Sequence, residues 1–136
     1  MPLIPANING VRVEFDPTVI RDVEQRMVDG LKYCIKPQVA AGHALSTIYI
    51  SSANDKHVLP SRHMQRKAVD ISRINGIKIV IGYSQVDAIT AIVDAIQGSF
   101  ENYHGKRENF GPQLKKKLGV VWPVSGHNDH IHLSVN

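Results

Sequence analysis

Hydrophobic and polar residues alternate along short segments of the chain, a period of two that is typical of half-buried strands. Val11–Phe15 shows this alternation near the N-terminus, and His130–Val135 shows it at the C-terminus. Thr47–Ser51 is rich in β-branched and aromatic residues, which strands favour. We therefore expect three strands at these positions.

The dipeptide Asn75-Gly76 separates two further apolar segments, residues 68–74 and 77–81. Asn-Gly is the strongest short signal for a tight hairpin, because both turn residues must accept a positive φ. The two segments are therefore predicted to pair antiparallel. The preceding stretch, residues 52–66, is polar, contains Pro60 and lacks a clear period, so we expect a loop.

Apolar residues recur every three to four positions in two other segments, which predicts helices with one buried face. The first helix is expected to begin at Asp16-Pro17, with Asp16 as the N-cap, and to end before Lys36-Pro37. The second is expected to begin with the capping box formed by Ser84 and Asp87 and to close at Gly98. A third, short helix is predicted over residues 112–118.

These elements mix without a regular βαβ order, which favours the α+β class over a doubly wound sheet. We expect a small antiparallel sheet with helices packed on one side. With 136 residues, the chain is predicted to form a single domain over residues 1–136.

Composition narrows the functional classes. The chain is 43% hydrophobic and 21% charged, as in soluble globular proteins, and Lys78 interrupts its longest apolar run, so we expect no membrane insertion. Its N-terminal residues lack the layout of a secretory signal, so we expect synthesis in the cytoplasm, with any action outside the cell following release by another factor.

Sixteen Lys and Arg residues against twelve Asp and Glu give a net charge of +4, which favours an anionic partner. Lys115–Lys117 is the one basic run, and we interpret it as the solvated face of the short helix. No nucleic-acid motif accompanies it, so no nucleic-acid partner is expected. A basic nucleic-acid binder stays the least favoured alternative, and steep salt dependence of DNA binding would identify it.

Three of the seven histidines, His127, His130 and His132, lie within six positions near the end of the chain. On a strand, alternate residues share a face, so His130 and His132 point together with Ser134. The apolar residues between them point to the core. Such a strand offers imidazole ligands to a metal without losing its packing.

Asp70 lies inside the first predicted hairpin strand, where a carboxylate is disfavoured unless it has a partner. His63, seven residues earlier, can fold back towards it. Catalytic zinc sites use three protein ligands and leave a fourth position for water, which the set His63, Asp70 and His132 would satisfy. Asp129 is then placed to accept the proton of that water.

Alternatives to this assignment stay open, and one is a hydrogen bond between an aspartate and a histidine that is unrelated to a metal, with the other histidines exposed. His130 shares a face with His132 and is a possible ligand in its place, and His127 is either a weaker alternative ligand or a rim residue. Asp129 has two competing roles, as a general base or as a group that orients a histidine or caps a turn.

Ser61-x-His63-x-x-x-x-Ala68-x-Asp70 resembles the Ser-x-His-x-x-Gly-x-Ala-x-Asp signature of the M15-type zinc peptidases. These include the D-alanyl-D-alanine peptidases and share a fold with the Hedgehog signalling domain. Asp129-x-x-His132 resembles the Asp/Glu-x-x-His pair of the same group.

The resemblance implies a Zn2+ ion held by His63, Asp70 and His132, with Asp129 as the general base. It also implies that His130 either supports the ligands without contacting zinc or stabilises the transition state. Small members of the group look like phage endolysins, which cleave stem peptides of bacterial cell-wall peptidoglycan, and an aspartate in the base position is more like those that cleave L-alanyl-D-glutamate bonds. D-alanyl-D-alanine cleavage stays open, and we expect a monomer.

The chain departs from the family pattern at two places. Arg66 stands where the signature has Gly, and Ser51–Asn54 replaces a Ser-Gly-Tyr-Arg stretch whose Arg helps to hold the substrate. Ser61, Arg62 and Arg66 are therefore the candidate substrate-binding residues. These departures also favour an alternative: a zinc-binding structural module of the same fold with little or no catalysis, as in a phage particle.

Overall fold

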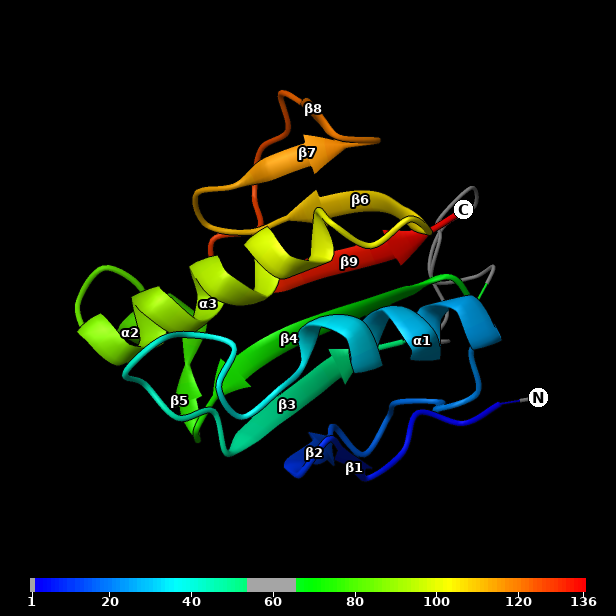
Figure 1. The fold of residues 1–136 in the computed structure, drawn as a ribbon, viewed down its shortest axis with the longest axis horizontal. Coiled ribbons are helices and arrows are strands. Elements are labelled where there is room, and N and C mark those ends of the chain that lie inside the picture. Colours follow the sequence, from blue (N-terminus) through cyan, green and yellow to red (C-terminus); the bar gives the residue numbers. More distant parts are fainter. Residues whose placement is uncertain (1, 54–65) are drawn as a thin grey trace.

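A computed structural model describes residues 2–53 and 66–136, which form a mixed α+β arrangement (Figure 1). The helices are α1 (Gln25–Cys34), α2 (Ile79–Gly82) and α3 (Asp87–Phe100). The strands are β1 (Asn7–Ile8), β2 (Val11–Phe15), β3 (Thr47–Ser52), β4 (Ala68–Ile74), β5 (Ile77–Lys78), β6 (Lys106–Phe110), β7 (Lys115–Lys117), β8 (Val120–Val121) and β9 (Ile131–Val135).

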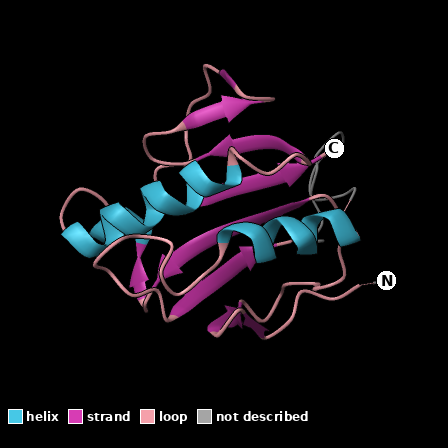
Figure 2. Ribbon diagram, viewed as in Figure 1, coloured by secondary structure: helices cyan, strands magenta, loops and turns pink. Residues whose placement is uncertain are grey.

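Within the described residues the strands form one sheet in the order β1-β2-β3-β4-β9-β6-β7-β8, with β5 paired to β4. All pairs are antiparallel except β2 and β3, which run parallel because α1 lies in the connection between them. The sheet is thus mostly antiparallel, as expected, but it is larger than the small sheet predicted. Helices α1 and α3 lie on the same face of it (Figure 2).

The core lies between this face of the sheet and the helices. Alternation along β4 and β9 turns Val69, Ile71, Ile131 and Leu133 towards the helices, where all are fully buried. The intervening residues therefore point to the opposite face, which no helix covers in Figures 1 and 2. Polar side chains of several strands gather on this open face of the sheet.

The predicted strands at 11–15, 47–51 and the C-terminus are all present, and so is the hairpin. Asn75 and Gly76 have φ values of 52° and 79°, the left-handed conformation that this turn requires. The second hairpin strand was predicted too long, because β5 ends at Lys78 and the chain then enters α2.

The predicted start of the first helix was wrong, since α1 begins at Gln25. Asp16 does not cap a helix: its Oδ1 accepts hydrogen bonds from the backbone N–H and the hydroxyl of Thr18, at 3.0 and 2.7 Å. These bonds complete a local turn. The chain after this turn pairs with the N-terminal segment through a Leu3–Asp22 bridge, which competes with a helix.

The predicted boundaries of the second helix also need correction. Ser84 makes no capping bond; it has a φ of 66°, and its N–H donates to Oγ1 of Thr90 at 2.7 Å. Gly98 lies inside α3, which continues to Phe100. Phe100 is fully buried, so its packing stabilises the last turn beyond the glycine.

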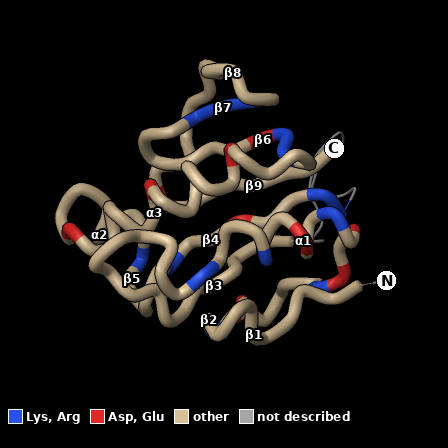
Figure 3. The backbone as a smooth tube through the Cα atoms, in the orientation of Figure 1, with Lys and Arg blue, Asp and Glu red and all other residues tan. Residues whose placement is uncertain are grey.

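The short helix predicted over residues 112–118 was wrong. Lys115–Lys117 forms β7, which pairs with β6 and appears as a basic strand in Figure 3. Leu118 and Gly119, with φ values of 53° and 80°, form the turn into β8. Pairing with a distant strand has here outweighed the local pattern.

Candidate functional site

Asp70 and His132 are direct partners across the antiparallel strands β4 and β9, although 62 residues separate them in the sequence. Oδ1 of Asp70 lies 2.8 Å from Nδ1 of His132. Both side chains lie on the open face of the sheet and are largely buried, with 15% and 12% of their surface exposed. The strand parity read from the sequence therefore brings together two of the three predicted ligands.

Glu108 contacts His132 from the other side. Its Oε1 lies 3.0 Å from Nε2 of the imidazole and accepts a second hydrogen bond, at 3.0 Å, from the hydroxyl of Ser134. The backbone N–H of Glu108 donates in return to the Ser134 hydroxyl at 2.9 Å. His132 is thus held between two carboxylates, and its orientation is fixed on both ring nitrogens.

Glu108 was missed by sequence reasoning, which treated its segment as irregular. The usable signal is the spacing of Glu108 and Phe110 on β6: residues two apart on a strand share a face, and Phe110 is the direct partner of His132 on β9. Only recognition of β6 as a strand beside β9 would have revealed it.

This environment changes the protonation of the site in the metal-free chain. Burial opposes the charging of His132, but hydrogen bonds to Asp70 and Glu108 outweigh it and raise the pKa of His132 to about 9. Burial likewise opposes the charging of Glu108, yet the bond to His132 lowers the pKa of Glu108 to about 2. At neutral pH the imidazolium of His132 therefore lies against the ionised carboxylate of Glu108.

Asp129 and His130 form a second pair next to the first. Oδ1 of Asp129 lies 2.6 Å from Nδ1 of His130, and Nε2 of the same ring lies 3.9 Å from Oδ1 of Asp70. The hydrogen bond from His130 lowers the pKa of Asp129. Asp129 is 67% exposed, so a carboxylate at the surface orients a histidine whose other nitrogen faces Asp70.

His127 completes a group of three imidazoles. Its ring centre lies 5.0 Å from that of His130 and 5.8 Å from that of His132, and it packs against Phe110 at 5.2 Å. Its Nδ1 is buried and has no hydrogen-bond partner among the described residues. Burial and the neighbouring histidines lower the pKa of His127, so this ring is neutral at neutral pH.

The chemistry of this cluster fits part of a zinc site. A zinc-bound histidine usually has its second nitrogen hydrogen-bonded to a carboxylate, which is the relation of Glu108 to His132. Among residues 2–53 and 66–136, however, no three His, Cys, Asp or Glu side chains are arranged to hold a metal. The predicted third ligand, His63, lies outside the described residues, as do Ser61 and Arg62.

Arg66 is described, and its position bears on the family signature. It adopts a φ of 61°, the left-handed region that favours glycine, at the place where the signature has Gly. Its guanidinium lies 3.5 Å from the carboxylate of Asp22, and its carbonyl accepts a hydrogen bond from the N–H of Glu24 at 2.8 Å. Arg66 thus contacts the segment before α1.

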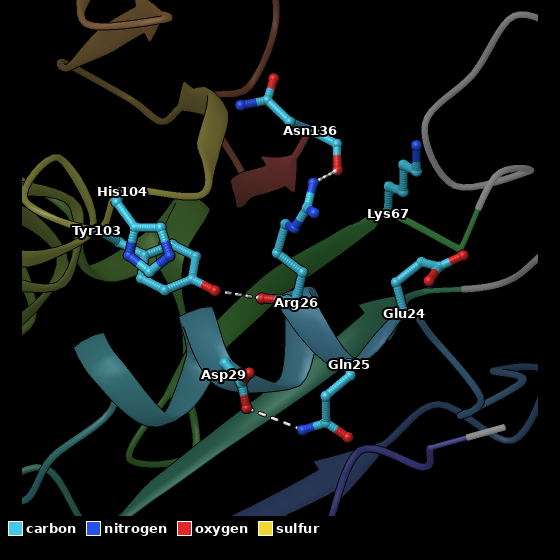
Figure 4. A pocket seen from close by; sticks show the side chains of 8 residues that line it. All are labelled: Glu24, Gln25, Arg26, Asp29, Lys67, Tyr103, His104 and Asn136. Carbon is cyan, nitrogen blue, oxygen red and sulfur yellow. Dashed lines mark hydrogen bonds between the residues drawn. The ribbon is translucent and has the colours of Figure 1, made fainter.

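A polar pocket of about 520 Å³ lies away from this cluster, between α1 and the C-terminal end of the chain (Figure 4). Internal bonds use several of its groups: Arg26 donates to the carbonyl of Asn136 at 2.7 Å, and the Tyr103 hydroxyl donates to the carbonyl of Arg26 at 2.8 Å. It includes none of the residues around Asp70 and His132. The cluster on the open face of the sheet is therefore the better candidate for chemistry.

Comparison with known proteins adds no further assignment. No protein-family model, curated protein or solved structure matches the chain. In the described part of the chain, no helix has both the length and the apolar character needed to cross a membrane. The function has to be argued from the site itself.

Proposed function

We propose that the protein is a zinc-dependent metallopeptidase that hydrolyses stem peptides of bacterial peptidoglycan. The observation that carries this proposal is the contact between Asp70 and His132, two predicted ligands that are distant in sequence and 2.8 Å apart in the fold. The neighbouring pair Asp129 and His130 supplies groups for proton transfer at the same site.

In this proposal His63, Asp70 and His132 hold the zinc ion. Zinc would supply a Lewis acid that acidifies water and polarises the scissile carbonyl. Glu108 accepts the remaining N–H of His132, which fixes the tautomer and leaves Nδ1 towards Asp70. Release of the second imidazolium proton accompanies metal binding, because a ligating histidine must be neutral.

Asp129 is proposed as the general base. Its lowered pKa keeps the carboxylate ionised at neutral pH, and its exposure leaves one oxygen open to solvent. The hydrogen bond to Asp129 holds the His130 ring with Nε2 directed at Asp70. As an imidazolium, with Nδ1–H bonded to Asp129, His130 would donate from Nε2 to an oxyanion that forms beside the ligands.

The substrate class rests on the resemblance of the motifs and on the net charge of +4, which favours an anionic wall polymer. Ser61, Arg62 and Arg66 are the proposed substrate-binding residues. L-alanyl-D-glutamate and D-alanyl-D-alanine bonds are both candidates, and action on the wall after release from the cytoplasm is part of the proposal.

The test is release of muropeptide fragments from purified peptidoglycan, followed by mass spectrometry. We expect fragments with the zinc-loaded protein, none after chelation, and recovery when zinc is restored. Asp129→Asn should lower the rate by about 100-fold or more while zinc stays bound. Asp87→Asn, an exposed aspartate in the first turn of α3, is the matched control. Unchanged rates after chelation or in Asp129→Asn would contradict the proposal.

A second candidate is a zinc-binding module that does not catalyse. The observation that favours it is Arg66, which holds a left-handed conformation suited to glycine and contacts Asp22 in an ion pair. Binding of one equivalent of zinc with no cleavage of any wall substrate would support this candidate.

A further inference from the structure

A groove of about 280 Å³ lies on the open face of the sheet, next to the Asp129–His130 pair. Asp129 forms one part of its wall, so the groove adjoins the proposed base. The remaining lining residues come from the end of β2 and from β3, β4, β5 and α2: Asp16, Tyr49, Ser51, Ser72, Arg73, Lys78 and Val80. Ser51 also donates a hydrogen bond to the backbone carbonyl of Asp70 at 3.4 Å.

Two cations face each other in this groove. Arg73 and Lys78 are direct partners across β4 and β5, and like charges at such positions destabilise a sheet. In the described part of the chain, neither forms an ion pair with a carboxylate. The charge of Arg73 does interact with the nearby carboxylate of Asp16, whose pKa it helps to lower. A bound anion would reduce the repulsion that remains between the two cations.

The guanidinium of Arg73 is fixed in place. It stacks 4.4 Å from the ring centre of Tyr49, its partner across β3 and β4. The Tyr49 hydroxyl donates to Oδ2 of Asp16 at 3.2 Å, which holds the aromatic ring. Tyr49, Arg73 and Lys78 thus form a ladder across three strands that presents two positive charges from a rigid surface.

The two carboxylates of the groove are already engaged. Asp16 accepts bonds from the N–H and hydroxyl of Thr18 and from Tyr49, and Asp129 is bonded to His130. One oxygen of Asp129 stays open to solvent as the proposed base, and the groups that can attract an anionic ligand are the two cations. A planar carboxylate suits a guanidinium, which can donate two parallel hydrogen bonds to it.

We propose that this groove is a substrate subsite in which Arg73 and Lys78 bind a free carboxylate of an acidic peptide. The inference rests on the proposed function for its substrate, and it supplies the cation that the sequence lacks at residues 51–54. Arg73 and Lys78 would select peptides with a free carboxylate beside the scissile bond and disfavour those in which this group is amidated.

The experiment measures binding without catalysis. The full chain, without added metal, is titrated with L-alanyl-D-glutamate and with the corresponding diamide while backbone amide NMR shifts are followed. We expect shifts around Tyr49, Arg73 and Lys78, and an affinity for the free acid about tenfold higher than for the diamide.

The double variant Arg73→Gln with Lys78→Gln should lose this preference. Lys36→Gln, which removes an exposed lysine above the Tyr33 ring, is the matched control and should keep it. Equal affinity of the wild type for both peptides, no detectable binding, or a preference that survives the double variant would each overturn the subsite. Failure of zinc-dependent cleavage alone would refute the proposed function and leave this binding result standing.

Discussion

Oε1 of Glu108 lies 3.0 Å from Nε2 of His132, on the side of the imidazole opposite to Asp70. One nitrogen of the imidazole therefore points to Asp70, a proposed co-ligand, and the other points to Glu108, which we propose orients the ring. This division of roles between two acidic residues makes them separable by mutation.

Glu108→Gln should weaken zinc binding without abolishing it. The amide keeps the size of the side chain but removes the charge that orients His132 and raises its basicity, and loss of such a partner typically costs about 10- to 100-fold in affinity. Competition with a chromogenic chelator measures this. Glu14→Gln, an exposed residue of β2, is the control, and an unchanged affinity in Glu108→Gln would contradict the assigned role.

Substitutions of His63, His127 and His132 should differ in their effect on metal content. We expect His132→Gln and His63→Gln to lose stoichiometric zinc, because each removes one of three proposed ligands. His127→Gln should keep one equivalent, measured by elemental analysis after dialysis. Loss of zinc in His127→Gln together with retention in His63→Gln would instead identify His127 as the third ligand.

The stability of the metal-free protein should depend on pH through the Glu108–His132 pair. The pKa of His132 is raised from 6.5 to about 9, so its contribution is complete below pH 6.5 and is lost as the pH rises to 9. The pKa of Glu108 is lowered from 4.5 to about 2, so its contribution is complete above pH 4.5 and is lost as the pH falls to 2. The pair therefore stabilises most between pH 4.5 and 6.5.

Urea denaturation between pH 3 and 10 tests this dependence. From pH 6.5 to 9 the free energy of unfolding should fall by about 3 kcal/mol, the equivalent of the shift of His132. Glu108→Gln should remove the Glu108 contribution to the acid limb and reduce the alkaline limb, where Asp70 still favours the imidazolium. A wild-type profile that stays level above pH 6.5 would show that His132 is neutral in the folded chain.

Asn75→Ala should destabilise the fold more than Gly76→Ala. Oδ1 of Asn75 accepts hydrogen bonds from the backbone N–H groups of Ser46 and Thr47 at 2.8 and 3.2 Å, and its Nδ2 donates to the carbonyl of Ala44 at 2.9 Å. Loss of these hydrogen bonds in Asn75→Ala should lower the free energy of unfolding by about 2–3 kcal/mol.

Gly76→Ala is the matched comparison, because the added Cβ meets nothing within 4 Å and only the φ of 79° is strained. We expect Gly76→Ala to lower the free energy of unfolding by about 1 kcal/mol. Thermal or urea unfolding measures both variants, and equal losses would show that Asn75 acts only through its turn conformation.

The sequence by itself determined those features that depend on residues close together in the chain. The hairpin at Asn75-Gly76 was predictable because two consecutive positive φ values require those residue types. The face of the sheet on which Asp70 and His132 lie was predictable in part, because alternation along a strand fixes which side chains share a face. Neither signal depends on a distant segment.

Tertiary structure decided the features that depend on a distant partner. Lys115–Lys117 forms a strand because β6 lies beside it, and Glu108 reaches His132 because β6 also pairs with β9. Hydrogen bonds between strands join residues that are far apart in the chain. A local pattern therefore does not predict which segment pairs with a given strand. The sequence by itself therefore determined the faces of the strands, and only the pairing of the strands decided which charges meet.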